Sequence, residues 1–168
     1  MGRKLIRSAW LGALILMNPV SARADATVLL GLMSVGSPRP SFGVAFGYCP
    51  SVVGFEIEYL GTLGGVTADH SSAGGVFASI IVQPVTTSDV QFFGIGGFGI
   101  WGETFVDGKG TGAVSAKKIG GGVKIGIAER LRLRLDYRLF LLGEPDDASR
   151  DPSTRHPQRF SAGLHLVF

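Results

Sequence analysis

The feature that most constrains the fold of this chain is an alternation of apolar with polar or small side chains, found in separate runs along the sequence. Successive side chains of a β-strand point to opposite faces of a sheet, so a period of two residues indicates strands. No segment after residue 24 shows the longer period of a helix. Eight such runs predict an all-β chain with strands at 26–35, 41–48, 53–62, 74–83, 90–102, 117–127, 131–141 and 158–168.

The connections between the predicted strands alternate in length. The second, fourth and sixth are the short segments CPSV, PVTTSD and AER, whereas the third, fifth and seventh are long; only the first, around GSPRP, is modest. An up-and-down meander places successive connections at opposite ends of a barrel. Short turns at one end and longer loops at the other are typical of transmembrane β-barrels. Most of the strands are also near the ~9–11 residues that a tilted strand needs to cross a membrane. We therefore predict an eight-stranded antiparallel up-and-down transmembrane β-barrel.

The polar faces of the strands indicate which side of the barrel wall faces the lumen. Between the apolar positions of several strands lie glycines and charged residues of both signs. Glycine weakens a water-facing strand because it has no side chain to pack against its neighbours. Inside an eight-stranded barrel, whose interior is just wide enough for side chains, glycine leaves space for the larger side chains opposite it. Buried charges of opposite sign are expected to pair. The sequence thus predicts a polar network inside the lumen: Glu56, Glu58, Lys124, Arg132, Arg134, Asp136, Arg138 and His165.

Three strands have apolar residues on both sides, so the faces of 26–35, 74–83 and 90–102 stay unassigned. A β-bulge around Gly96–Gly97 is one interpretation of the third. Aromatic residues fall near both ends of the predicted strands: Tyr48, Phe55, Phe92 and Phe168 near the short turns, and Phe42, Trp101, Phe105, Phe140 and Phe160 near the long loops. Two aromatic girdles at the membrane interfaces are one interpretation, and ordinary aromatic enrichment in strands is the other. A soluble lipocalin-like barrel, with its apolar face inside, is the alternative fold.

The first 24 residues predict a secretory signal peptide. Arg3, Lys4 and Arg7 precede a short apolar stretch, and the tripeptide ARA ends at Ala24. Cleavage there leaves a barrel domain at 25–168. It also removes four of the 16 basic residues and none of the 13 acidic ones, so the remaining chain carries 12 basic against 13 acidic side chains. Nucleic-acid binding is therefore not expected.

The last run, RFSAGLHLVF, carries apolar residues at Phe160, Leu164, Leu166 and Phe168. It resembles the C-terminal assembly signal of Gram-negative outer-membrane proteins. The chain from residue 25 resembles the small eight-stranded barrels of the OmpX/Ail type and the OmpA transmembrane domain, although its loops are modest and it has no peptidoglycan-binding domain. The resemblance implies insertion by the barrel-assembly machinery, location in the outer membrane of a Gram-negative bacterium, and contact with membrane lipid and lipopolysaccharide.

Candidate chemistry is sparse. His70 and Ser71 only loosely echo the motif of a lipid A deacylase, and Ser161, His165 and Asp136 share the expected interior; the partners expected for His165 are Arg134, Asp136 or Glu56. We expect no catalytic site, metal or cofactor. The expected role is structural, or one of interaction at the cell surface through the external loops. The sequence does not indicate what these loops bind. Three alternatives stay open: a narrow solute channel, a lipid-modifying outer-membrane enzyme and a soluble periplasmic ligand-binding barrel.

Overall fold

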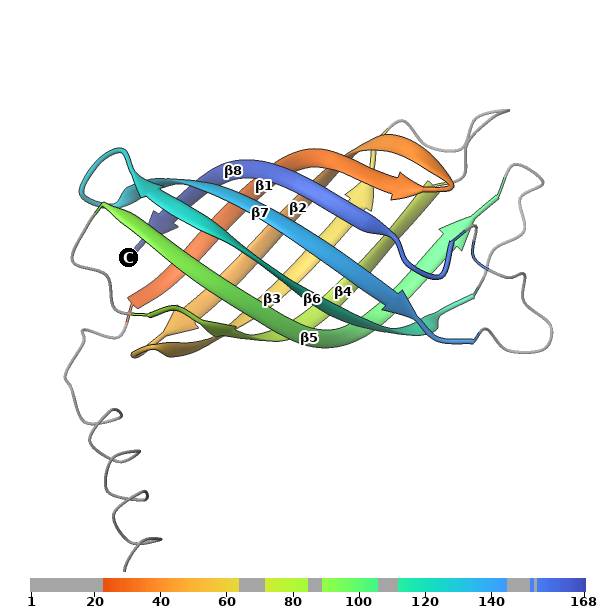
Figure 1. Ribbon diagram of the computed structural model, residues 1–168, viewed down its shortest axis with the longest axis horizontal. Helices are drawn as coiled ribbons and strands as arrows, with labels where there is room; N and C mark the ends of the chain where they lie inside the picture. Colours follow the sequence, from red (N-terminus) through yellow and green to blue (C-terminus); the bar gives the residue numbers. More distant parts are fainter. Residues whose placement is uncertain (1–22, 64–71, 85–88, 106–111, 145–151, 153) are drawn as a thin grey trace, which may run out of the picture.

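The strands of the computed structural model close into one antiparallel barrel (Figure 1). The structure describes residues 23–63, 72–84, 89–105, 112–144, 152 and 154–168. Each strand pairs with its neighbour in the sequence, and the first pairs with the last, so that no sheet edge is left open. The strands are β1 (Arg23–Val35), β2 (Ser37–Cys49), β3 (Val53–Thr62), β4 (Ser72–Val82), β5 (Val90–Thr104), β6 (Val114–Gly126), β7 (Leu131–Leu142) and β8 (Gln158–Val167). The predicted all-β, eight-stranded barrel is confirmed.

The strand boundaries differ most from the prediction at the β1–β2 hairpin. Gly36 is the whole connection between the two strands, and its φ of 70° is a conformation that favours glycine. β1 begins at Arg23, so only the last two residues of the predicted signal peptide at 1–24 lie among the described residues. Cleavage after Ala24 stays a prediction. No helix in the described part of the chain is long and apolar enough to span a membrane.

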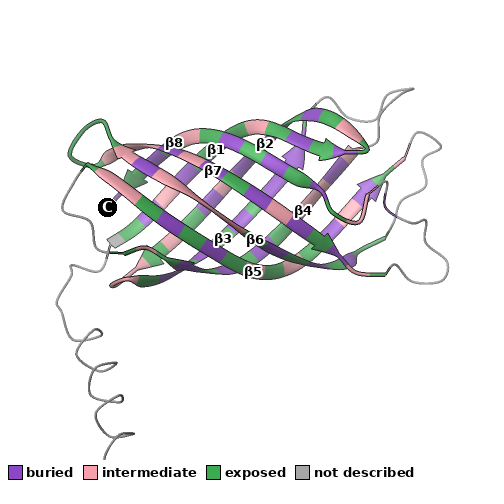
Figure 2. Ribbon diagram, viewed as in Figure 1, coloured by how far each residue is buried: buried purple, intermediate pink, exposed green. Residues whose placement is uncertain are grey.

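The outer face of the barrel is apolar over its whole circumference. Exposed and buried residues alternate along much of each strand (Figure 2). The exposed residues include Leu30, Phe46, Ile57, Phe98 and Phe160, each with about 60% or more of its surface accessible. Water-soluble monomers seldom expose apolar patches larger than a few hundred Å². The apolar face therefore lies outside, where lipid covers it, and the lipocalin-like alternative with an apolar interior face is wrong.

The structure assigns the faces of β5, one of the three strands that the sequence left ambiguous. The pairing of β5 with β4 and β6 runs through Gly96 and Gly97 without an extra residue, so the proposed β-bulge is wrong. Phe93, Ile95 and Trp101 point into the barrel, whereas Phe92, Phe98 and Ile100 point out. β5 showed no single polar–apolar alternation because it is apolar on both faces.

The apolar interior residues gather mainly at the long-loop end. Trp101 and Phe140 are 1% and 0% exposed inside the barrel, so neither belongs to an interfacial girdle. The ring of Phe140 lies 5.2 Å from that of Phe77 and 5.5 Å from that of Trp101. We call this cluster the apolar plug; its members are Met33, Val35, Leu60, Ala73, Phe77, Trp101, Val114, Ala116, Phe140 and Leu142.

Candidate functional site

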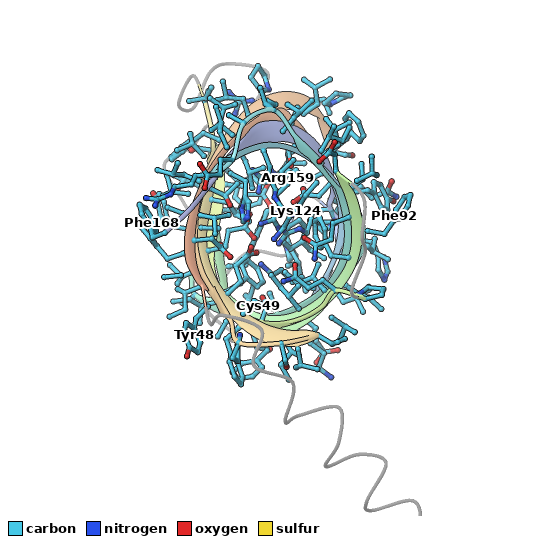
Figure 3. All side chains as sticks on the ribbon, turned by 90° about the vertical axis from the view of Figure 1, so that its left-hand side faces the viewer. Tyr48, Cys49, Phe92, Lys124, Arg159 and Phe168 are labelled. Atoms are coloured by element: carbon cyan, nitrogen blue, oxygen red, sulfur yellow. The ribbon has the colours of Figure 1, made fainter. Side chains whose placement is uncertain are left out.

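Most of the buried charged side chains occupy the barrel between the apolar plug and the short-turn end, whereas Arg39 and Glu103 lie at the long-loop end. β3 and β7 supply five of them, because each strand places alternate residues inward: Glu56 and Glu58 from β3, and Arg134, Asp136 and Arg138 from β7. All five are at most 2% exposed. Figure 3 shows the interior filled with side chains, with Lys124 and Arg159 inside the ring of strands and Phe92 and Phe168 outside it.

Glu58 is the centre of the network. It accepts hydrogen bonds from Lys118 Nζ at 2.5 Å, from Arg138 Nη1 at 2.7 Å and from Arg159 Nη1 at 2.7 Å. These cations come from β6, β7 and β8, so one carboxylate ties three strands to β3. Isolated charge is costly away from water, and this pairing offsets that cost.

Glu56 and Asp136 complete the network. Arg134 donates to Glu56 from Nη1 at 2.5 Å and to Asp136 from Nε at 3.0 Å. Arg138 donates from Nη2 to both of these carboxylates, at 3.3 Å and 2.8 Å respectively. Ser161 Oγ donates to Asp136 Oδ1 at 2.6 Å. Arg134 thus contacts two carboxylates and Arg138 three, which fixes the position of β7 relative to β3.

The remaining predicted residues lie nearer the short-turn end. Lys124 Nζ donates to Gln83 Oε1 at 3.3 Å and lies over the ring of Phe93. Arg132 Nη1 donates to Gln91 Oε1 at 2.8 Å and is only partly buried. The structure therefore does not bring Lys124 and Arg132 into contact with the carboxylates around Glu58.

His165 has partners other than those expected. Its Nδ1 lies 2.8 Å from Thr27 Oγ1 and 3.8 Å from Asp25 Oδ1. Thr27 and Asp25 lie on β1, which pairs with β8 to close the barrel. Arg134, Asp136 and Glu56 were the expected partners, but the register that seats His165 beside β1 is not visible in the sequence.

Lys118, Arg159 and Asp25 are interior residues that the sequence analysis missed. Lys118 is an even number of residues from Lys124, and Arg159 from His165, so the alternation itself carried the signal for both. Asp25 directly follows the predicted cleavage site and precedes the predicted strand at 26–35, so the sequence did not place it in a strand. Its carboxylate is 8% exposed within β1.

The described residues offer no assembled catalytic set. Ser161 donates to Asp136, while His165 contacts Thr27, so the hydroxyl–imidazole contact that activates a nucleophile is not formed between Ser161 and His165. His70 lies outside the described residues. Within the described ranges, no group of three or more His, Cys, Asp or Glu residues could hold a metal ion.

The residues of the predicted assembly signal share the outer face of β8 and its end. Phe160, Leu164, Leu166 and Phe168 are 60%, 54%, 41% and 65% exposed. They therefore lie within the apolar exterior. Their recognition by the assembly machinery stays a prediction.

Solved structures share this fold, although no protein-family model and no curated protein matches the chain. Neisserial surface protein A, NspA, is 15% identical, with 88% of this chain and 97% of that chain covered and a TM-score of 0.69. The N-terminal barrel domain of Pseudomonas aeruginosa OprF is 11% identical, with 87% and 97% covered and a TM-score of 0.66. Ail of Yersinia pestis is 11% identical, with 88% and 99% covered and a TM-score of 0.57. The chain has the fold of these proteins and is a small eight-stranded outer-membrane β-barrel.

An enzyme also has this fold. The outer-membrane enzyme PagL is 8% identical, with 84% of this chain and 98% of that chain covered and a TM-score of 0.52. Likeness of fold therefore does not separate an enzyme from a non-enzyme, and the function must be argued from the residues.

Proposed function

We propose that this protein is an integral outer-membrane barrel with a closed lumen, which acts as a rigid anchor and presents its long loops at the surface. The observation that carries the proposal is the filling of the interior by large, fully buried side chains. Trp101, Arg134, Arg138, Arg159, Phe77, Lys124 and Phe140 are among the largest of them. An eight-stranded barrel has an interior just wide enough for such side chains.

Two successive layers support closure. In the middle layer, the carboxylates of Glu56 and Glu58 hold arginine side chains that reach across from β7. At the long-loop end, the rings of Phe77, Trp101 and Phe140 pack against one another. A permeating solute would have to break buried ion pairs in one layer and displace aromatic rings in the other. This arrangement favours a closed barrel over a narrow channel.

A surface-interactive role is supported by the distribution of the connections. The strands that precede the three long connections, β3, β5 and β7, end at the same end of the barrel, whereas both described ends of the barrel domain lie at the other (Figure 1). A structure of Ail contains the heparin analogue sucrose octasulfate, so a barrel of this fold can carry a binding surface. The loops of this chain are the corresponding place to seek a partner.

The interior chemistry favours a non-enzymatic role. The acids and bases that a hydrolase would use are engaged in ion pairs inside the filled barrel, as Asp136 is with Arg134 and Arg138. Lipid does not reach them there. A lipid-modifying site would have to use groups on the outer surface or in the connections.

Single-channel recording in planar bilayers tests the closed lumen. The unaltered chain is expected to give no discrete current steps, and its insertion is checked by recovering folded protein from the bilayer-forming vesicles. A Phe77→Gly/Phe140→Gly variant removes two rings of the apolar plug, and a further Glu58→Ala change also removes the central carboxylate. If this triple variant folds, we expect it to conduct. Regular current steps from the unaltered chain would overturn the proposal.

A further inference from the structure

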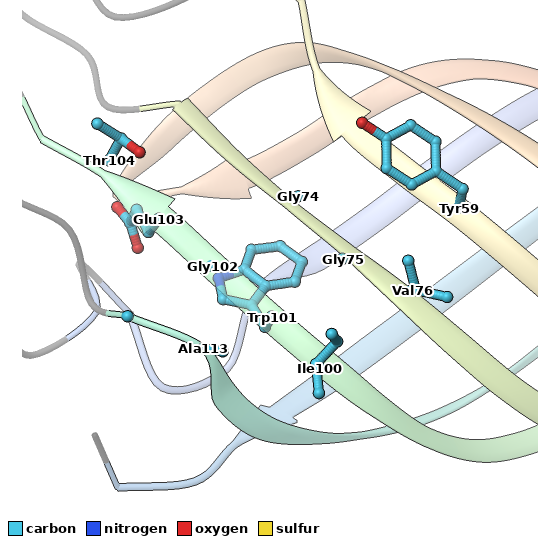
Figure 4. Close-up of a pocket in the computed structure, with 11 residues that line it drawn as sticks. Tyr59, Gly74, Gly75, Val76, Ile100, Trp101, Gly102, Glu103, Thr104 and Ala113 are labelled. Carbon is cyan, nitrogen blue, oxygen red and sulfur yellow. The ribbon is translucent and has the colours of Figure 1, made fainter. Parts of the chain in front are cut away.

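We propose that a groove in the outer wall of the barrel, between β4 and β5 at the long-loop end, holds one acyl chain of a membrane lipid. The groove has a volume of about 510 Å³ and is lined by residues of β3, β4 and β5 and by Gly112 and Ala113, which directly precede β6 (Figure 4). Ligand sites of small molecules occupy ~300–1,000 Å³ and are mainly apolar. The inference rests on the membrane insertion proposed above.

Glycines create the depression. Gly74 of β4 pairs with Gly102 of β5, and both point outward, so two neighbouring positions of the wall have no side chain. Gly61 of β3 pairs with Gly74 on its other side, but the ring of Phe42 lies beside Gly61. The wall is therefore thinnest over Gly74 and Gly102.

The walls of the groove are apolar, and its loop end is polar. Tyr59, Val76 and Ile100 flank it and are 53%, 42% and 58% exposed. Thr104 is the last residue of β5 and lies at the loop end of the groove (Figure 4). This polarity matches a lipid whose chain lies along the groove and whose polar part lies nearer the long loops.

A lipid chain fits the groove better than a protein partner does. The groove is continuous with the apolar exterior, of which Tyr59, Val76 and Ile100 are part, so the medium that surrounds it in a membrane is lipid. A stable protein interface buries about 1,200–2,000 Å², which a single narrow depression does not offer. An acyl chain requires only a narrow apolar channel with an open side.

Two leucine substitutions provide a matched test. A Cβ added at Gly102 would meet only Gly112 O at 3.6 Å, and one added at Gly96 only Lys118 O at 4.0 Å, so both positions have room for a side chain. Both residues point outward from β5, but only Gly102 lines the groove. Gly102→Leu therefore fills the groove, and Gly96→Leu adds the same bulk elsewhere on the same strand.

Native mass spectrometry of the full chain, taken from lipid vesicles into detergent, measures retained lipid. We expect the unaltered chain and Gly96→Leu to retain one lipid molecule and Gly102→Leu to lose it. Retention by no variant, or equal retention by all three, would overturn the inference. Folding of each variant is checked first by the mobility shift on boiling, so a failure of membrane insertion is distinguished from an empty groove.

Discussion

Arg138 of β7 donates a hydrogen bond from Nη1 to Oε2 of Glu58 on β3 over 2.7 Å, and this bond crosses the width of the barrel. In a closed ring of eight strands, β3 and β7 are four strands apart in both directions. Neither side chain has any exposed surface. The pair therefore braces opposite walls that share no backbone hydrogen bonds.

Removing the charge of Glu58 should be costly. In a Glu58→Gln variant, Lys118, Arg138 and Arg159 lose their shared carboxylate while the barrel still surrounds them. Breaking a buried ion pair from one side costs about 3–5 kcal/mol. We expect the free energy of unfolding in urea, measured in lipid vesicles, to fall by that amount.

The control for Glu58 is Glu144, which is exposed just after β7. Surface substitutions usually change stability by no more than ~0.5 kcal/mol. Equal effects of Glu58→Gln and Glu144→Gln would contradict a buried network.

The hydroxyl of Ser161 should contribute through its bond to Asp136. That bond is 2.6 Å long and buried. A hydrogen bond to a charged group contributes about 1.5–3 kcal/mol. We expect Ser161→Ala to lower the free energy of unfolding by this amount, and Ser34→Ala, which alters an exposed serine of β1, to leave it nearly unchanged. A Ser161→Ala variant as stable as the Ser34→Ala variant would show that the bond does not form.

The apolar plug should respond to truncation as a protein core does. Phe140 is fully buried against Phe77 and Trp101, whereas Phe160 is 60% exposed on the outer face. Truncating a buried phenylalanine to alanine costs about 3–5 kcal/mol. Phe140→Ala should therefore destabilise the barrel much more than Phe160→Ala in urea titrations. The reverse order would place Phe140, and not Phe160, against lipid.

β1 and β8 pack closely where they close the barrel, so alanine should have different effects at Gly163 and Gly94. A Cβ on Gly163 of β8 would collide with the backbone oxygen of Val28 on β1, while a Cβ on Gly94 would meet nothing within 4 Å. Overpacking costs about 1–3 kcal/mol, whereas alanine in place of an unstrained glycine stabilises by about 0.4–1 kcal/mol. We expect Gly163→Ala to reduce the folded fraction on unheated gels and Gly94→Ala to keep or raise it. Equal folded fractions would mean that β1 and β8 do not pack in this register.

The sequence predicted the strands well because each polar face is marked along its own strand. β3 and β7 alternate charged and apolar residues, so Glu56, Glu58, Arg134, Asp136 and Arg138 were placed inside from local pattern alone. The faces of β5 could not be predicted in this way, because Trp101 faces the apolar plug, Ile100 faces lipid, and both residues are apolar.

The sequence did not predict which side chains pair with one another across the lumen. Strand tilt and register decide that Glu58 meets Lys118 and Arg159, residues 60 and 101 positions away along the chain. They likewise decide that His165 meets Thr27. Alternation specifies the face of a strand, whereas the height at which two strands meet depends on the closed geometry of all eight.

The closed transmembrane barrel is tested most directly by the mobility of the protein in detergent gels, run unheated and after boiling, from fractionated membranes. A closed transmembrane barrel is expected in the outer-membrane fraction, with an unheated band that shifts on boiling because the braced strands stay folded in cold detergent. A protein found in the aqueous fraction, with the same mobility before and after boiling, would contradict the assignment of the apolar face to lipid and of the charged network to the interior.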